Sequence, residues 1–350
     1  MTVDILSVPP TRHAAISALV PELVPGRRVA ISTHLNADGD GCGSESALAR
    51  LLSAHGLVPR IVNPTPWPDM FAFLLGDDVD DQTSRGSKAL RDIDLLIVLD
   101  ISDVKRLGNL TESVRALTVP KLVIDHHLPS DDPAGTRAVS DTSACATAEL
   151  VYDLAIVAGW EITPAVARSL YTGMLTDTGG FRFSNTSPRC LSVAGQLLAY
   201  GVDPEDMYTR IYASAPAGRV RLMAEVLGTL QVDEAYGLSW LTMAADALEK
   251  HNVKAEDLDG IVEHARSIAG TKMALFFRDL GHGKVKVSFR SVGGTDVNAF
   301  ARRFGGGGHA KASGAMLTGT LEQVRDLVVE AARAMLSTEL QRPLSVGGRE

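Results

Sequence analysis

The sequence predicts an α/β protein whose first domain contains a mostly parallel sheet with helices on both faces. Three short apolar runs, residues 28–33, 94–99 and 121–124, each end in acidic or histidine side chains. Helical patterns lie between them, and alternating strands and helices are typical of a parallel sheet. Because ligands bind outside the carboxyl ends of such strands, we expect these polar side chains to meet at one edge.

The other elements of the first domain follow from periodicity and from glycine and proline signals. We expect a glycine-rich turn over residues 39–43 between the first strand and the next helix. The remaining expected elements are helices over 10–24, 43–55, 143–176 with a break near Gly159, 188–200 and 204–213, and a strand over 58–62.

A second, smaller α/β domain is expected after a connecting helix over residues 217–230. Its expected elements are strands over 237–243, 272–278 and 284–290, and helices over 255–269, 296–303 and 321–336. These patterns predict a first domain over 1–213, a linker helix over 214–234, a second domain over 235–340 and a flexible tail over 341–350.

Charge is divided unevenly along the chain. The net charge is −8, yet residues 268–311 contain eight Lys or Arg and two Asp or Glu, a net charge of +6. An acidic part suits cations and a basic part suits phosphate. The three cysteines show no CxxC spacing, which predicts neither a disulfide framework nor a zinc site. With no secretory signal and no apolar run near the ~20 residues of a membrane span, we expect a cytoplasmic protein.

The first polar group is His34, Asp38 and Asp40, which lie within seven residues. Carboxylates suit hard divalent cations, and an imidazole in the set favours Mn²⁺ or another transition metal. We expect Gly39 to let the backbone turn so that the two carboxylates point at separate cations. An aspartate–glycine turn that caps a helix would explain the same residues.

The second and third strands end in Asp100 and in Asp125-His126-His127. A carboxylate between two cations ~3.5–4 Å apart is typical of two-metal hydrolases, although a lone aspartate after a strand is often only a cap. Adjacent residues of an extended segment point in opposite directions. One histidine can therefore bind metal while the other faces substrate, with Asp125 orienting an imidazole.

Two further motifs fit a phosphate-processing site. Asp177 ends a helical stretch, where a negative charge is unfavourable unless a cation lies nearby, although a helix end with a glycine stop is the alternative. Residues 305–308 are four glycines followed by His309, flanked by arginines and a lysine. Glycine amides can approach an anion closely, although many glycine runs are only flexible loops.

In this order, the four polar groups resemble the four motifs of the DHH phosphoesterase superfamily. Residues 304–314 resemble the Gly-Gly-Gly-His signature of the associated DHHA1 domain. The length is similar to that of the compact subgroup of nano-RNases, which act as oligoribonuclease and as 3′-phosphoadenosine 5′-phosphate (PAP) phosphatase, and of actinobacterial cyclic-dinucleotide phosphodiesterases. Ala37 stands where the family commonly has proline, a residue that supplies no ligand.

The resemblance implies two Mn²⁺ ions and a nucleotide-binding second domain facing them across a cleft. His127 would be catalytic together with the bridging Asp100. One ion would be bound by His34, Asp38 and Asp100, and the other by Asp40, Asp100, His126 and Asp177. The nucleotide would be bound by Arg290, Asn298, Gly306, Gly307, Gly308 and His309.

The expected activity is manganese-dependent hydrolysis of short oligoribonucleotides such as pApA, cyclic dinucleotides such as c-di-AMP, or PAP to nucleoside monophosphates. Expected partners are these short substrates and a second copy of the chain in a homodimer. Neither a membrane nor long duplex nucleic acid is expected as a partner. A non-catalytic nucleotide sensor of the same fold is an alternative. A RecJ-like exonuclease is another alternative. Such an enzyme would be expected to stack the bases of a long single strand on aromatic side chains, but Phe, Trp and Tyr make up only 5% of this chain.

Overall fold

The computed structural model describes residues 5–258, 260–308 and 310–340, and its chain divides into two compact units, Met1–Ser214 and Ala215–Glu350. Each unit contains one β-sheet with helices packed against it, so the predicted α/β class is confirmed. Within the described residues, no helix combines the length and the apolar character that crossing a membrane requires.

The sheet of the first unit has five parallel strands in the order β2-β1-β3-β4-β5. The strands are β1 (Arg28–Ser32), β2 (Val58–Ile61), β3 (Leu95–Leu99), β4 (Lys121–Asp125) and β5 (Arg137–Ser140). From β1 the chain first adds β2 on one side and then adds β3, β4 and β5 on the other side. Open α/β sheets bind ligands at such a switch point, which here lies between the carboxyl ends of β1 and β3. The patterns did not predict β5, because it is short and its only buried residue is Val139.

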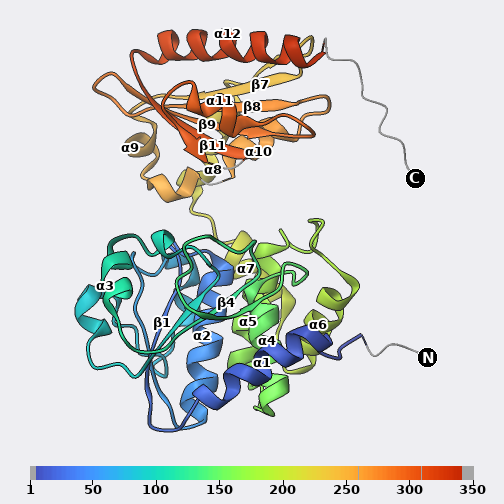
Figure 1. Ribbon diagram of the computed structural model, residues 1–350. Coiled ribbons are helices and arrows are strands. Elements are labelled where there is room, and N and C mark those ends of the chain that lie inside the picture. Colours follow the sequence, from blue (N-terminus) through green and yellow to red (C-terminus); the bar gives the residue numbers. More distant parts are fainter. Residues whose placement is uncertain (1–4, 259, 309, 341–350) are drawn as a thin grey trace. The chain divides into compact units, whose positions relative to one another are not determined.

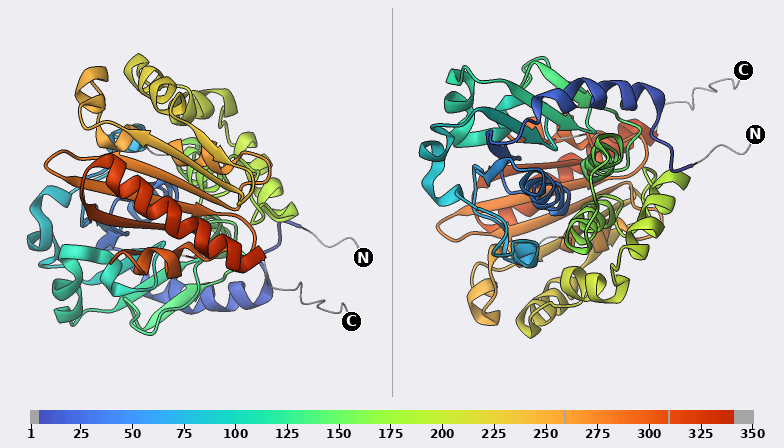
Figure 2. Two further views of the ribbon diagram at one scale, coloured as in Figure 1. Left: turned by 90° about the horizontal axis from the view of Figure 1, so that it is seen from above. Right: turned by 90° about the horizontal axis from the view of Figure 1, so that it is seen from below.

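Alternate strand residues face two separate cores, which explains why these strands are apolar throughout. Val29 and Ile31 pack with the longer helices, whereas Ala30 faces the short helices on the other side. Figure 2, seen from below, shows α2 in blue and α4 and α5 in green running side by side. The helices are α1 (Pro10–Leu19), α2 (Gly39–Ala54), α3 (Thr111–Ala116), α4 (Thr147–Ala158), α5 (Pro164–Asp177), α6 (Pro188–Ala199) and α7 (Pro204–Tyr212), with 3₁₀ helices η1 (Val20–Glu22), η2 (Asp69–Leu74), η3 (Thr83–Leu90) and η4 (Val104–Leu110).

The predicted glycine turn over residues 39–43 is wrong, because these residues form the first turns of α2. The glycines are required by close packing and not by a left-handed backbone. A Cβ on Gly43 would collide with the backbone of α5 at Ser169 and Gly173, and one on Gly41 would lie 2.8 Å from the Thr33 hydroxyl. The missing side chains therefore let α2 lie directly against α5 and the end of β1.

The second unit contains a six-stranded mixed sheet in the order β10-β11-β9-β8-β7-β6, in which only β7 and β8 are parallel. Helices α11 and α12 pack on one face, and α8, α9 and α10 on the other (Figure 1). The elements are α8 (Ala217–Leu227), β6 (Gln231–Asp233), β7 (Leu238–Met243), α9 (Ala247–His251), η5 (Ala255–Leu258), α10 (Ile261–Arg266), β8 (Met273–Asp279), β9 (Lys284–Ser291), α11 (Val297–Arg302), β10 (Gly307–Gly308), β11 (Ala312–Thr318) and α12 (Leu321–Leu340).

Two predictions for this unit need correction. The helix expected over residues 255–269 is divided into η5 and α10, with Gly260 in a left-handed conformation at φ 82° before α10. The segment after the glycine run forms the strand β11, which was not predicted because glycine and alanine weaken a strand pattern. Pairing with β9 over seven residues supplies the stability that the local sequence lacks.

Candidate metal centre and phosphate-binding segment

His34 and Asp38 lie just beyond the carboxyl end of β1. The Nδ1 atom of His34 lies 2.9 Å from the carbonyl oxygen of Leu35. Because a carbonyl only accepts hydrogen bonds, Nδ1 carries a proton, and Nε2 presents a lone pair once the ring is neutral. Asp38 caps α2 with one oxygen, which accepts from the amides of Asp40 and Gly41. Its other oxygen lies 3.7 Å from His34 Nε2, so the predicted cap and a metal ligand are compatible in one carboxylate.

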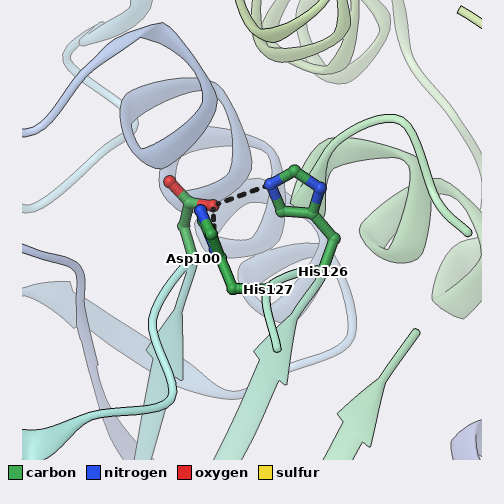
Figure 3. Close-up of side chains that lie close together, drawn as sticks. All are labelled: Asp100, His126 and His127. Atoms are coloured by element: carbon green, nitrogen blue, oxygen red, sulfur yellow. Dashed lines mark ion pairs between the residues drawn. The ribbon is translucent and has the colours of Figure 1, made fainter. Parts of the chain in front are cut away.

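Asp100 follows β3 and directs its two oxygens toward different partners. Its Oδ2 lies 3.3 Å from His34 Nε2, and its Oδ1 lies 3.6 Å from His126 Nε2. The residue is 2% exposed and has a left-handed backbone, with φ 63°. Such strain in a residue other than glycine is often found at functional sites. Figure 3 shows Asp100 facing the imidazoles of both His126 and His127.

His126 directs a bare nitrogen into the site. Its Nδ1 lies 3.3 Å from the carbonyl oxygen of Ala144, which leaves Nε2 deprotonated in the neutral ring. This Nε2 is buried and has no hydrogen-bond partner among the described residues. A buried unpaired acceptor costs free energy, and a cation at that position would satisfy it.

His127 has a different environment, as the alternation of adjacent side chains predicted. Its Nδ1 donates to Asp125 Oδ1 at 2.7 Å, and Asp125 also accepts from the Ser102 hydroxyl. Because Nδ1 is engaged with Asp125, its 3.7 Å approach to Asp100 is not that of a metal ligand. The side chain is 45% exposed, so its Nε2 is free to meet a substrate.

Asp40 and Asp177 approach His126 from two packed helices. Asp40 lies at the start of α2 and its Oδ2 is 3.9 Å from His126 Nε2, while Asp177 ends α5 and its Oδ2 is 3.6 Å away. Asp40 also accepts hydrogen bonds from the amides of Thr147 and Ala148, which begin α4. The helix end predicted at Asp177 is confirmed.

Electrostatics in the metal-free site oppose this crowding of carboxylates. Burial, reinforced by Asp40 and Asp38, raises the pKa of Asp177 to about 8. Burial together with neighbouring carboxylates also raises the pKa of Asp40 and, more strongly, that of Asp100. Burial opposes protonation of His34, but Asp100 and Asp38 outweigh it and raise its pKa to about 10. A divalent cation would replace these protons and neutralise the acidic cluster.

The donor set fits such cations on grounds of geometry as well. Besides Asp100/His126/His127, two groups, His34/Asp38/Asp100 and Asp40/His126/Asp177, each offer ligand atoms within 4.8 Å of one another. Asp100 joins them, because its two oxygens face His34 and His126 respectively. Mixed imidazole and carboxylate ligands with a shared carboxylate are suited to two transition-metal ions. The structure therefore brings together all six residues predicted to bind metal.

The glycine segment lies in the second unit, where Gly307 and Gly308 form β10 against β11. A Cβ on Gly306 would collide with the backbone of Gly314, so the segment needs glycine to pair closely with β11. Asn298 Oδ1 is buried without a hydrogen-bond partner in the described chain, near Gly307. Arg290 Nε donates to Glu263 at 3.0 Å. His309, also predicted to bind nucleotide, lies outside the described residues.

The sequence patterns missed Thr147, Glu149 and Asn185, which surround the metal centre. Thr147 donates its hydroxyl to Asp100, and Asn185 donates to the Asp177 carboxylate. Glu149 accepts from the amide of Cys145 at 2.9 Å. The run of small residues over 143–148 was a weak signal of close packing, but nothing in it indicated these partners.

Comparison with known proteins matches both units to family models. The model of the DHH family, N-terminal domain, matches residues 28–174, and that of the DHHA1 domain matches residues 238–338. The bifunctional oligoribonuclease and PAP phosphatase NrnA of Thermus thermophilus is 36% identical over 308 residues, covering 88% of this chain and 90% of that protein. The protein of the same name from Bacillus subtilis is 30% identical over 294 residues, covering 83% and 89%.

A solved structure agrees with these sequence matches. The crystal structure of an exopolyphosphatase-related protein from Bacteroides fragilis has a TM-score of 0.84 and 28% identity, covering 93% of this chain and 98% of that chain. Fold and site define the class of the protein as a phosphoesterase with clustered Asp and His side chains suited to metal. The chain belongs to the DHH/DHHA1 phosphoesterase family.

Proposed function

We propose that this protein uses two Mn²⁺ ions to hydrolyse short oligoribonucleotides and PAP to nucleoside monophosphates. The observation that carries the proposal is the shared carboxylate of Asp100, whose two oxygens face the imidazoles of two separate ligand groups. The names of the relatives from Thermus thermophilus and Bacillus subtilis support the choice of substrates. We further propose that the reaction takes place in the cytoplasm, and the expected homodimer stays a prediction.

In this proposal one ion is bound by His34, Asp38 and Asp100, and the other by Asp40, Asp100, His126 and Asp177. When bound, two such cations supply Lewis-acid chemistry, which neutralises phosphoryl charge and makes water a nucleophile at neutral pH. The chain contributes a preorganised set of ligands. His34 and His126 each face a backbone carbonyl with Nδ1 and aim Nε2 inward, so binding a cation requires release of the Nε2 proton of His34 but no rotation of either ring.

His127 acts on the substrate as the proton donor. A hydrogen bond to Asp125 fixes its ring and raises the pKa of His127. Burial opposes this increase, and the charge of Asp100 adds to it. A protonated imidazole with an exposed Nε2–H can stabilise charge on a phosphoryl oxygen and then protonate the leaving oxygen. For PAP that oxygen becomes the 3′-hydroxyl of AMP, and for pApA it belongs to the released nucleotide.

The second unit binds the nucleotide in this proposal. The amides over Gly306–Gly308 and the Asn298 side chain provide a polar edge beside β11, and His309 is assigned to the same role. Arg290 contributes a positive charge, which forms an ion pair with Glu263 in this structure. Glycine amides and arginine are suited to a terminal phosphate.

The test is a substrate panel of pApA, PAP and c-di-AMP with Mn²⁺, assayed for release of AMP and phosphate. We expect Asp100→Ala to lower turnover of pApA and PAP by more than the roughly 100-fold typical for loss of an outer-shell partner. The matched control is Asp103→Ala, because Asp103 caps η4 and belongs to none of the three ligand groups in the described structure. Full activity in the Asp100 variant would overturn the assignment.

The panel also separates the remaining alternatives. Tight binding of pApA with no turnover would favour the nucleotide sensor, and processive cleavage of long single strands would favour a RecJ-like exonuclease. Hydrolysis of c-di-AMP at a rate comparable to that of pApA would extend the proposed function to cyclic dinucleotides.

A further inference from the structure

One buried turn lies behind four of the six proposed metal ligands. Residues 144–148 connect the region after β5 to the first residues of α4, and all five are buried. Their contacts are Ala144 O with His126 Nδ1 at 3.3 Å, Cys145 O with Asn185 Nδ2 at 2.9 Å, the Thr147 amide with Asp40 Oδ2 at 2.6 Å, the Ala148 amide with Asp40 Oδ1 at 2.9 Å, and the Thr147 hydroxyl with Asp100 Oδ1 at 3.0 Å.

Thr147 contacts the bridging carboxylate directly. Its hydroxyl donates to Oδ1 of Asp100, the oxygen that faces His126, while Oδ2 of Asp100 stays directed toward His34. A carboxylate can rotate about its terminal torsion, whose energy wells are broad. The hydrogen bond from Thr147 fixes that torsion, so that each oxygen meets its own ligand group.

Asn185 extends the same turn to the last ligand. Its Nδ2 donates to the carbonyl oxygen of Cys145 at 2.9 Å and lies 3.2 Å from both the carbonyl oxygen and Oδ2 of Asp177. The side chain thus ties the end of α5 to the turn before α4. The orientation of Asp177 therefore depends on the position of the same turn.

A buried ionic cluster holds the turn in place. Glu149 accepts from the Cys145 amide with Oε2, and its Oε1 pairs with Arg12 at 2.8 Å and with Arg189 at 2.6 Å. Both arginines also pair with Asp153, which is 0% exposed. Because the Cys145 amide donates to a carboxylate that two arginines hold in place, the cluster opposes movement of the turn.

We propose that the turn over residues 144–148 is the positioning element of the metal centre, and that Thr147 is the positioning residue that sets the bridging geometry of Asp100. This inference rests on the proposed function, because it presupposes two bound cations. It assigns Thr147 no contact with substrate. Its effect is exerted through Asp100, so it is expected first in metal binding and only consequently in turnover.

The experiment compares Thr147→Val with Thr147→Ser in the full chain. Valine keeps the shape and removes the hydroxyl, whereas serine keeps the hydroxyl and removes a methyl group. Thr172→Val is the matched control, because Thr172 is equally buried in α5 and its hydroxyl donates only to the carbonyl of Arg168. Calorimetric titration with Mn²⁺ measures affinity and stoichiometry, and electron paramagnetic resonance detects coupling between two bound Mn²⁺ ions.

We expect Thr147→Val to weaken binding of Mn²⁺ by about 10- to 100-fold and to lose the spin coupling. Thr147→Ser and Thr172→Val should bind as the wild type does. The opposite order, with the serine variant weaker than the valine variant, would show that Thr147 serves packing alone and would overturn the inference. Equal affinity in all variants would overturn it too, while failure of the wild type to bind Mn²⁺ would instead remove the proposed metal centre on which it rests.

Discussion

At the scale of single residues, three of the proposed metal ligands each make two kinds of interaction. Asp38 caps a helix with one oxygen and faces His34 with the other. His34 and His126 donate from one ring nitrogen to a carbonyl and present the other. Because backbone amides and carbonyls hold one end of each side chain, the atom that faces the site is oriented by the fold before a cation binds.

The hydrogen bond between Asp125 and His127 predicts a change in pH dependence. Asp125→Asn removes the carboxylate that raises the pKa of His127, so the imidazolium form is lost at a lower pH. If His127 donates the proton, the alkaline limb of kcat for pApA moves to lower pH in this variant. His127→Gln should lose the limb and about 100-fold or more in kcat, and pH–rate profiles of the two variants test this assignment. An unmoved alkaline limb in Asp125→Asn would contradict it.

The crowded carboxylates predict that the metal-free protein loses stability as pH rises. The folded chain holds a proton on Asp177, with a pKa of about 8, which the unfolded chain releases near the ordinary value of 3.8. The folded state therefore binds more protons between these values, and the free energy of unfolding falls as pH increases through that window. Denaturant titrations in the presence of a chelator should show the slope.

The control for this pH effect is Asp177→Asn, which cannot ionise at that position. Its metal-free stability should depend less steeply on pH than that of the wild type. Addition of Mn²⁺ should raise the free energy of unfolding of the wild-type protein most strongly at the upper end of this pH range, because the metal then displaces fewer protons. An equally steep slope in the Asn variant would show that Asp177 is not the group responsible.

At the scale of elements, contact between α2 and α5 brings proposed metal ligands from distant parts of the chain into one site. Gly43 on α2 lies against the backbone of Gly173 on α5, where an added Cβ would lie 2.9 Å from the Gly173 amide nitrogen. Asp40 and Asp177 lie on these same two helices. Close approach of the helices is therefore a requirement of the site as well as of the core.

Substitution of that glycine tests the requirement. Gly43→Ala should lower the free energy of unfolding by about 1–3 kcal/mol through overpacking, and should weaken Mn²⁺ binding. Gly195→Ala in α6 is the matched control, because nothing lies within 4 Å of its added Cβ. There alanine should raise stability by roughly 0.5–1 kcal/mol. Denaturant unfolding of both variants measures the contrast, and equal effects would refute the close-packing explanation.

At the scale of the whole molecule, the two compact units carry different parts of the proposed chemistry. All residues of the three potential metal-binding groups found in the described structure belong to the first unit, and the glycine segment belongs to the second. A cation that binds the native state stabilises the structure that contains its ligands. Its effect should therefore be concentrated in the first unit.

Hydrogen exchange measured with and without Mn²⁺ tests this division. We expect added protection over residues 33–41, 124–128 and 144–149, because their amides surround the ligands. Strands β8 and β9 should exchange at an unchanged rate, and they serve as the internal control. Equal protection in both units would show that metal binding is not confined to the first.

The convergence of the candidate metal-binding side chains was predictable from local sequence, because strands of a parallel sheet present their carboxyl ends at one edge. His34, Asp100 and His126 follow three apolar strands that the patterns identified. The two-domain α/β architecture was equally predictable. By contrast, β5 and β11 were missed because edge pairing and glycine-rich pairing leave weak local signals.

By itself, the sequence determined which side chains could bind metal and in which order they come along the chain. Only the tertiary structure decided that residues 39–43 form a helix, that each oxygen of Asp100 has its own partner, and that one turn lies beside four proposed metal ligands. The physical reason is range: strand and helix patterns are local, whereas Thr147 lies 47 residues from Asp100 and meets it only through packing.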